Sequence, residues 1–298
     1  MLPGNQTVQS AASEVRPGWY PDPWRIAPHR WWDGRQWTPI LRGPYGEAWP
    51  VYRAPALMPT PFQPKGPGIQ GGGVAAVGAA IGVALSSLVG VGFALSGHLS
   101  LDDPWLLLGS QLGLWVGFVG AVIFASKRNG TGSLSADYGL AWPRTTDLGM
   151  GVLGGAIGRL IPTVLALLIA LAAGIGNSSS RHAPTILGTQ PQGDFGWAVV
   201  VVLAVVGAPL VEELLFRGLV QGAFSRRTGA IPAIYITALI FSFAHIFNEG
   251  PAAPLLLFPA ALILGYLRHR TGRLVAGIVA HATFNATLFL VLLIPVLR

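Results

Sequence analysis

The feature that most constrains this chain is a series of long apolar stretches between residues 74 and 297. Charged residues make up only 10% of the 298 residues, whereas soluble domains carry about 25%. A helix that spans a bilayer needs about 20 predominantly apolar residues. The stretches therefore predict an all-α polytopic membrane bundle of about seven spans, near residues 74–96, 104–126, 148–174, 197–224, 230–247, 253–267 and 274–297.

The fifth and sixth of these spans are short, and prolines such as Pro232 and Pro251 interrupt them. Broken spans are tolerated in a membrane where they line a cavity enclosed by protein. We therefore expect these two spans to form one continuous bent pair around Asn248-Glu249-Gly250.

Composition excludes several classes of function. The chain has no cysteine, which rules out disulfides, thiolate metal sites and a cysteine nucleophile. Its net charge of +7 would suggest nucleic acid if the basic residues formed one soluble face. They lie instead in the N-terminal tail and in short loops, which suits lipid headgroups and predicts no nucleic-acid partner. No apolar signal-peptide region follows Met1 within thirty residues, so we expect the first span to direct insertion.

The N-terminal segment, residues 1–42, predicts a small β module with a tryptophan core. Asp33-Gly34 lies between aromatic residues, a strong hairpin signal because both positions tolerate positive φ. The runs Gly18–Pro23 and Trp31–Gly34, with Trp37, resemble a Trp-rich module of unknown function found in bacterial membrane proteins. That resemblance implies a bacterial plasma membrane protein. The alternative to a folded β module is a disordered tail with exposed aromatic residues. A Pro- and Gly-rich linker is expected at residues 43–73, followed by a transmembrane domain at residues 74–298.

Loop charges predict the orientation, since cytoplasmic loops carry an excess of Lys and Arg. The loops on the opposite side hold mainly acidic residues. We therefore expect a cytoplasmic N-terminus and an external C-terminus. The basic residues of the expected cytoplasmic loops are Lys127, Arg128, Arg144, Arg226, Arg227, Arg268, Arg270 and Arg273.

Two adjacent carboxylates lie within the fourth span. A charge at this depth costs roughly 2.5–3.5 kcal/mol on insertion scales, so such residues usually face a bundle interior or a wet cavity. Glu213 and Arg217 are four residues apart and can pair on one helix face. Glu212 points about 100° away around the helix, so it need not take part in this pair and is available for another role. The alternative is that Glu212, Glu213 and Arg217 form one structural ion cluster.

Histidines on two other spans favour a site over such a cluster. His245 ends the fifth span, and His281 and Asn285 share one face of the seventh. We estimate the membrane depth of each group by counting about 1.5 Å per residue from the cytoplasmic end of its span. The depths of Glu212, His245, His281 and Asn285 then differ by no more than about two helical turns. A carboxylate can act as general base, a histidine can share the proton or bind a metal, and His281 with Asn285 can donate to an oxyanion. Gly-x-Ser-x-Gly and His-Glu-x-x-His are absent, which disfavours serine-protease and zincin mechanisms.

The chain resembles the CAAX-protease and bacteriocin-processing family in three ordered motifs: Glu212-Glu213-x-x-x-Arg217, Phe241-x-x-x-His245 and His281-x-x-x-Asn285. The resemblance covers roughly residues 145–297 and implies an α-helical intramembrane endopeptidase. It implies that Glu212 and His245 activate water. His281 and Asn285 would be the oxyanion pair, and Glu213 and Arg217 would support the site.

Several alternatives stay open. Glu212, His245 and His281 could hold a divalent metal such as zinc, and the same trio can activate water without one. The implied substrate is a membrane-associated peptide or protein. Glu and His relays also serve proton-coupled transporters, and a catalytically inactive immunity or scaffold protein could keep the same motifs. Arg159, inside the third span, is expected to pair with a bundle carboxylate or to reach the membrane surface.

The loop charges generate a prediction about topology. A reporter fused after Arg227 should be cytoplasmic, and one fused at Gly188 should be external, because the basic bias has one sign in every loop. Paired alkaline phosphatase and fluorescent-protein fusions at both positions measure this. The reverse pattern at the two positions would show that the orientation is wrong.

Overall fold

The computed structural model describes residues 16–22, 27–34, 37–43, 70–97, 100, 102–172 and 193–293. The chain divides into two compact units, residues 1–61 and 62–298. Most of the expected linker lies outside the described residues. The first helix nevertheless begins at Gln70, so the glycines Gly71–Gly73 belong to a helix and not to the linker.

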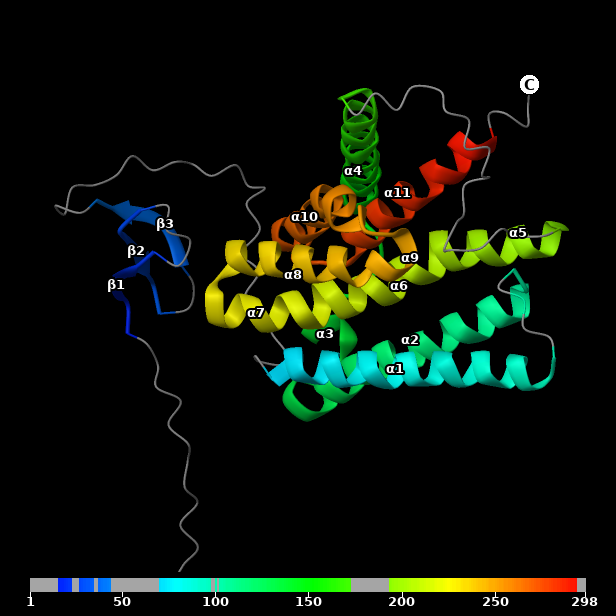
Figure 1. Ribbon diagram of the computed structural model, residues 1–298. Coiled ribbons are helices and arrows are strands. Elements are labelled where there is room, and N and C mark those ends of the chain that lie inside the picture. Colours follow the sequence, from blue (N-terminus) through cyan, green and yellow to red (C-terminus); the bar gives the residue numbers. More distant parts are fainter. Residues whose placement is uncertain are drawn as a thin grey trace, which may run out of the picture. The chain divides into compact units, whose positions relative to one another are not determined.

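The first unit contains a three-stranded antiparallel sheet in the order β1-β2-β3 (Figure 1). Its strands are β1 (Gly18–Pro21), β2 (His29–Trp32) and β3 (Trp37–Arg42). Trp32 pairs with Trp37 across the turn that contains Asp33 and Gly34, and Gly34 adopts a φ of 93°. The rings of Trp32 and Trp37 pack edge to face at 5.2 Å. The predicted small Trp-cored β module is therefore confirmed.

The second unit is helical, and each of the seven expected spans has a counterpart in it. The segments α5, α6 and α7 are parts of one long helix, joined by π-helical turns at Leu203–Gly207 and Leu214–Val220. The helices are α1 (Gln70–Leu95), α2 (Pro104–Asn129), α3 (Leu134–Tyr138), α4 (Thr145–Ala172), α5 (Gly193–Val202), α6 (Ala208–Glu213), α7 (Gln221–Thr228), α8 (Ala230–Ala244), α9 (Ile246–Glu249), α10 (Ala253–Thr271) and α11 (Val275–Leu293).

Four of the described helices are long and apolar enough to cross a membrane: Gly71–Leu95, Pro104–Asn129, Thr145–Leu168 and Gly193–Thr228. Two shorter apolar helices, Ala230–Ala244 and Val275–Phe289, accompany them. Large apolar side chains such as Leu88, Leu160 and Leu171 remain exposed on the outer helices. An outward-facing apolar surface of this kind fits a lipid environment, and the predicted all-α membrane bundle is confirmed.

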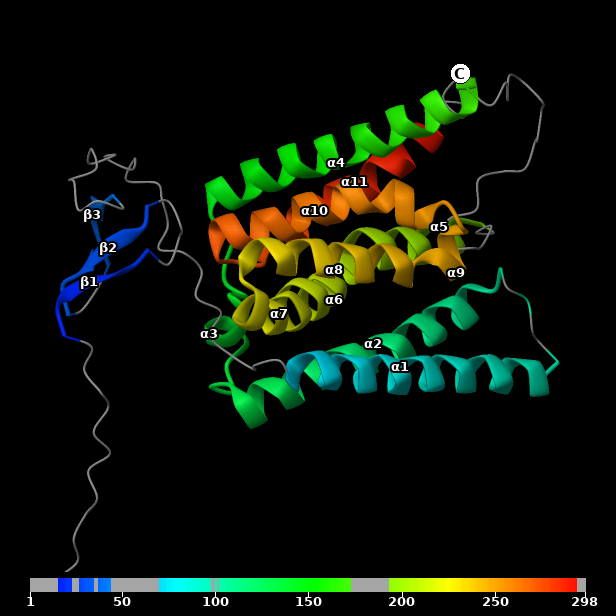
Figure 2. The same ribbon diagram turned by 60° about the vertical axis from the view of Figure 1, so that its left-hand side comes forward.

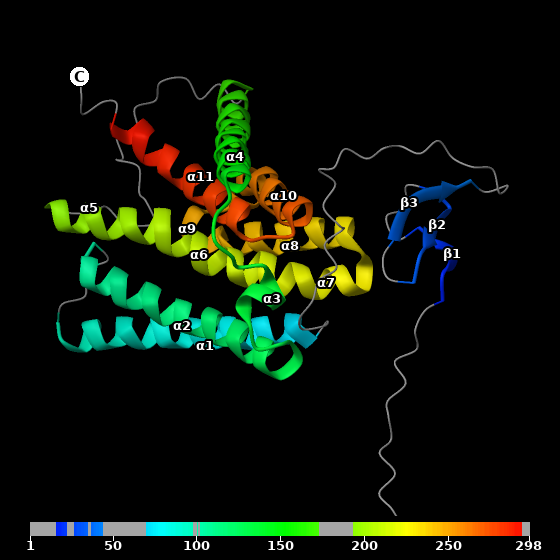
Figure 3. The ribbon, with the colours of Figure 1, turned by 180° about the vertical axis from the view of Figure 1, so that it is seen from behind.

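The long helix α5–α7 lies in the middle of the bundle. The α1–α2 hairpin packs on one side of it, and α4, α10 and α11 lie on the other (Figures 1 and 2). The view from behind shows the same order, with α3 connecting α2 to α4 at one end (Figure 3). Side chains that project from the middle helix can therefore meet groups on α8, α10 and α11.

The fifth and sixth spans do not form the continuous bent pair that the sequence suggested. Helix α8 ends at Ala244, His245 caps it, and the short α9 stops at Gly250 with a φ of 83°. That backbone conformation is open to glycine and unfavourable for most other residues. Helix α10 then packs against α8 as a separate helix. The break leaves His245 at a helix end, where it faces the bundle interior.

Glycines let α1 and α2 approach closely. A Cβ atom at Gly117 would collide with the backbone of Gly78 and Gly82 on α1, whereas a Cβ at Gly120 would meet nothing within 4 Å. Small residues at such contacts are how membrane helices pack without a hydrophobic driving force.

The contrast between the two glycines yields a matched test. Gly117→Ala should destabilise the protein by about 1–3 kcal/mol, because the added methyl overpacks a backbone contact. Gly120→Ala makes the same change on the same helix in open space and should leave stability unchanged or raise it by up to about 1 kcal/mol, because Ala favours the helix over Gly. Thermal unfolding in detergent compares the two. Equal melting temperatures for both variants would contradict the tight α1–α2 contact.

Candidate active site

The two adjacent carboxylates lie on the short segment α6, with a π-helical turn on each side. Such wide turns are rare and often accompany functional sites. Ala208 donates its N–H to the carbonyl of Leu203, five residues back, which is the π spacing. Pro209 follows and has no N–H to donate, so the next carbonyl in this register, that of Ala204, loses its helical partner.

Asn285 of α11 takes the place of that missing partner. Its Nδ2 donates to the Ala204 carbonyl at 2.7 Å. One of the two amide hydrogens is thereby used to join α11 to the middle helix, and the other is left for a further acceptor. Asn285 lines a cavity at this point, so its side chain both holds the helices together and borders the site.

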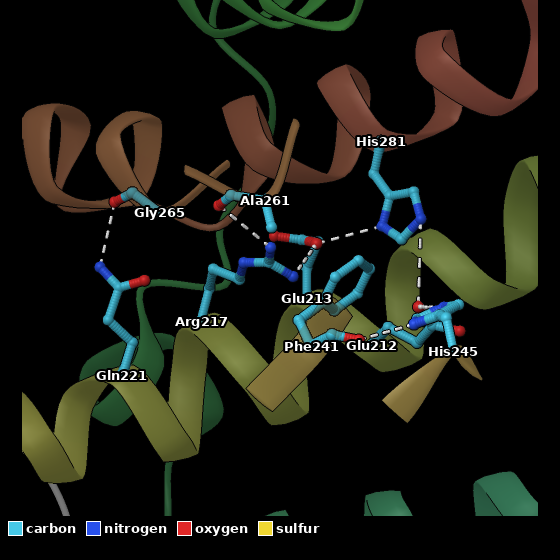
Figure 4. A network of polar contacts seen from close by, with 9 residues as sticks. All are labelled: Glu212, Glu213, Arg217, Gln221, Phe241, His245, Ala261, Gly265 and His281. Carbon is cyan, nitrogen blue, oxygen red and sulfur yellow. Dashed lines mark hydrogen bonds and ion pairs between the residues drawn. The ribbon is translucent and has the colours of Figure 1, made fainter. Parts of the chain in front are cut away.

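Glu213 is completely buried and is neutralised by Arg217, as the four-residue spacing suggested. Arg217 Nη1 lies 2.9 Å from Glu213 Oε1, and both side chains are 1% exposed or less. His281 Nδ1 lies 3.1 Å from the same carboxylate oxygen (Figure 4). The guanidinium also stacks over the Phe241 ring at 4.4 Å. One oxygen of this carboxylate, Oε1, therefore contacts both neighbours, and the other, Oε2, is buried without a hydrogen-bond partner among the described residues.

Two side chains of the middle helix also bond to α10. Arg217 Nη2 donates to the Ala261 carbonyl at 3.3 Å, and Gln221 Nε2 donates to the Gly265 carbonyl at 3.0 Å (Figure 4). The two donors are four residues apart on the middle helix, and the two acceptors are four residues apart on α10. One face of the middle helix is therefore bonded to one face of α10. These contacts fix the rotation of the middle helix relative to α10, and therefore the direction of the neighbouring Glu212.

Glu212 has a different environment from Glu213. Its Oε2 atom lies 3.7 Å from His245 Nε2 and 4.0 Å from His281 Nε2, distances too long for direct hydrogen bonds. The Glu212 side chain is 14% exposed and that of His245 is 21% exposed. Both can therefore be reached from the cavity, in contrast to the sealed Glu213–Arg217 pair.

The proton positions on the two histidines follow from their partners. His245 Nδ1 lies 2.7 Å from the Phe241 carbonyl, and because a carbonyl only accepts, Nδ1 carries the proton. His281 Nδ1 faces the ion-paired carboxylate of Glu213 and donates in the same way. In their neutral forms both rings then present an Nε2 lone pair toward Glu212.

A cavity of about 120 Å³ brings these groups together. Glu212, His245, His281 and Asn285 all border it, and the rest of its wall is mostly apolar. Two charged residues that the motifs do not include, Arg159 and Glu249, also line it. For Arg159 the sequence signal was a charge within an apolar span, whereas Glu249 lies between the expected fifth and sixth spans and had no such signal.

Arg159 takes neither of its expected positions. It donates from Nε at 3.0 Å and from Nη2 at 2.8 Å to the Phe284 carbonyl of α11, and its guanidinium stacks on the Phe284 ring at 3.7 Å. Among the described residues, no ion pair links it to a carboxylate. Within the same part of the chain, no group of three or more His, Asp or Glu side chains is arranged to hold a metal ion.

The geometry thus defines a polytopic membrane protein with a carboxylate–histidine cluster in an internal cavity. Comparison with known families agrees: residues 194–287 match the type II CAAX prenyl endopeptidase Rce1-like family. Residues 17–57 match a family of proteins of unknown function (DUF2510). The predicted resemblance is confirmed over the segment that carries the motifs, and the match supports an integral membrane protein of the CAAX-type protease class. No curated protein and no solved structure gave a match.

The sealed ion pair leads to a prediction about stability. Arg217→Ala should destabilise the protein by about 3–5 kcal/mol, because it leaves the fully buried Glu213 without its cation. Arg227→Ala removes the same side chain from an exposed position near the end of the same helix and should change stability little. Thermal unfolding in detergent measures both variants.

A double variant separates the lost charge pair from lost packing. Glu213→Gln combined with Arg217→Met should recover part of the stability, because no unpaired charge remains. If Arg217→Ala alone melts at the wild-type temperature, Glu213 does not depend on this arginine.

Proposed function

We propose that the protein is an intramembrane endopeptidase that cleaves a membrane-associated peptide or protein with a water activated by Glu212 and His245. The observation that carries the proposal is the approach of two histidine Nε2 atoms to one carboxylate oxygen, Glu212 Oε2, at 3.7 and 4.0 Å, in a cavity shared with Asn285. That oxygen is buried and has no hydrogen-bond partner among the described residues. The adjacent Glu213 is held by Arg217 and His281, which leaves Glu212 to act as base.

The spacing suits a water molecule between Glu212 and His245. Both face the gap as acceptors, since His245 has its proton on Nδ1, so they cannot bond to each other. A water can donate one hydrogen to each and keep its oxygen lone pair for attack on a peptide carbonyl. As the water oxygen bonds to the carbonyl carbon, Glu212 takes one of the water protons and gives it to the leaving amine when the C–N bond breaks. His245 holds the second water proton and can accept it when the product carboxylic acid ionises.

The negative charge that develops on the attacked carbonyl oxygen needs donors. Asn285 retains one amide hydrogen after its bond to Ala204. His281 has its Nδ1 against the Glu213 carboxylate, so it can donate from Nε2 only when the ring is doubly protonated. Asn285, joined by His281 when that ring is doubly protonated, would provide the electrostatic stabilisation typical of an oxyanion site.

The N-terminus is cytoplasmic and the protein belongs to a bacterial plasma membrane, as the loop charges and the N-terminal module suggest. A chelator added to the assay described below distinguishes a metal-bound water from a water held by Glu212 and His245 alone. The transporter and inactive-scaffold alternatives predict that no peptide is cut.

Activity of site variants tests the mechanism. Glu212→Gln keeps the side-chain volume and removes the base, so peptide cleavage should fall by about 10²–10⁴. His245→Ala should fall similarly, and the double variant should be barely slower than either single one, because the two residues act as one unit. Asn285→Ala should lower turnover by about 10²–10³ with substrate binding largely kept. Cleavage of a peptide library by purified protein in nanodiscs provides the measurement.

Two controls complete this test. Arg227→Ala has its substitution far from the cavity and should cleave at the wild-type rate. Melting temperatures of all variants show whether a loss of activity reflects unfolding. Cleavage by Glu212→Gln at the wild-type rate would contradict the mechanism. A wild-type protein that cleaves no peptide would favour the transporter or scaffold alternative.

A further inference from the structure

Arg159 lines the cavity with its charged side chain but has no role in the proposed reaction. It is the only Lys or Arg among the described residues that line the cavity of Glu212 and His245. It projects from α4 near the middle of a long apolar helix, where a cation is costly and usually serves a function. Its half-buried side chain is therefore a candidate for contact with substrate.

The guanidinium is fixed in place with one donor edge unused. Nε and Nη2 both donate to the Phe284 carbonyl, and the Phe284 ring lies against the flat face at 3.7 Å. These contacts use two of the five N–H donors of the side chain. Among the described residues, no hydrogen bond involves Nη1. The edge formed by Nη1 and Nη2 matches the two oxygens of a carboxylate.

The charges around Arg159 restrict where an acidic ligand can bind in the cavity. Glu212 and Glu249 line the same cavity, and neither forms an ion pair with Arg159. Elsewhere in the cavity a ligand carboxylate would meet these acidic groups, so only the Arg159 edge can accept it. Arg159 bonds to residue 284 and the proposed oxyanion donor is Asn285, which sets the acidic group close to the reacting carbonyl.

We propose that Arg159 is a specificity-determining residue that binds a carboxylate of the peptide substrate beside the bond to be cut. The substrates are then peptides with an acidic group near the cleavage site, either a free C-terminus or an Asp or Glu side chain. This inference rests on the proposed endopeptidase function. It extends that function by naming the chemical group that the substrate must carry.

Matched peptides test the inference with the full-length protein in nanodiscs. Starting from a cleaved library peptide, one form has its C-terminus amidated, and another has its acidic side chains replaced by Asn or Gln. The first form reports on a terminal carboxylate and the second on a side-chain carboxylate. Loss of the bound carboxylate should lower wild-type kcat/KM by about 10- to 100-fold, the range for a charge-assisted hydrogen-bonded pair.

Variants assign that preference to Arg159. In Arg159→Gln the acidic and neutral peptides should be cleaved at nearly equal rates, and Arg159→Lys should restore part of the preference because it keeps the charge without the fork. Arg128→Gln removes an exposed arginine from the end of α2 and should keep the wild-type ratio. A merely structural Arg159 would change stability and overall rate but not the ratio.

A binding arm separates this inference from the proposed mechanism. Affinities of the acidic and neutral peptides are measured by fluorescence anisotropy on Glu212→Gln, with and without Arg159→Gln. A carboxylate preference that disappears with Arg159 supports the inference whether or not Glu212 is the base. Equal binding and equal cleavage of acidic and neutral peptides by protein with Arg159 intact would overturn it, while leaving the endopeptidase proposal in place. If the wild-type protein cleaves no peptide, the endopeptidase proposal fails, and the library's binding preference decides the inference.

Discussion

The bundle depends on the neutralisation of one buried carboxylate, Glu213. An ion at this depth is stable only if a counter-charge and further hydrogen bonds replace the water that it has lost. Arg217 supplies the charge from the same helix, and His281 supplies a donor from α11. Arg217 in turn reaches a carbonyl of α10. Three helices are thus oriented by one group, and a glycine on α11, Gly277, leaves the room for it.

The orientation set by Glu213 explains how two identical neighbours differ. Successive residues of a helix point about 100° apart, so Glu212 is turned out of the sealed cluster into the cavity. The two carboxylates divide the requirements of an active site between them. Glu213 holds the surrounding helices in register, and Glu212 keeps one oxygen free of hydrogen bonds to the described residues, opposite two imidazole rings. The proposed enzyme site would need both kinds of group, because a catalytic side chain has to be held in its productive geometry by its surroundings.

The sequence predicted the parts of this structure that depend on composition and simple spacing. Apolar stretches located the spans, and the four-residue spacing of Glu213 and Arg217 located their contact. The predicted continuity of the fifth and sixth spans was wrong, because the conformation of Gly250 is not visible in hydropathy. The π-helical turns around α6 have no side-chain signature, so the bond between Asn285 and Ala204 could not be foreseen. Arg159 was recognised as unusual, but its carbonyl partner lies 125 residues away in the chain.

Backbone carbonyls, more than side-chain pairs, connect the walls of the cavity. Pro209 leaves the Ala204 carbonyl without its helical partner, and Asn285 binds there. The preceding residue of α11, Phe284, offers its own carbonyl to Arg159 of α4. Two consecutive residues of α11 therefore join it to the middle helix and to α4. A shift of α11 along its axis would break both bonds at once, so the donor side of the cavity is held against the carboxylate side before any substrate arrives. Such preorganisation is what lets fixed dipoles stabilise a developing charge without first having to reorient.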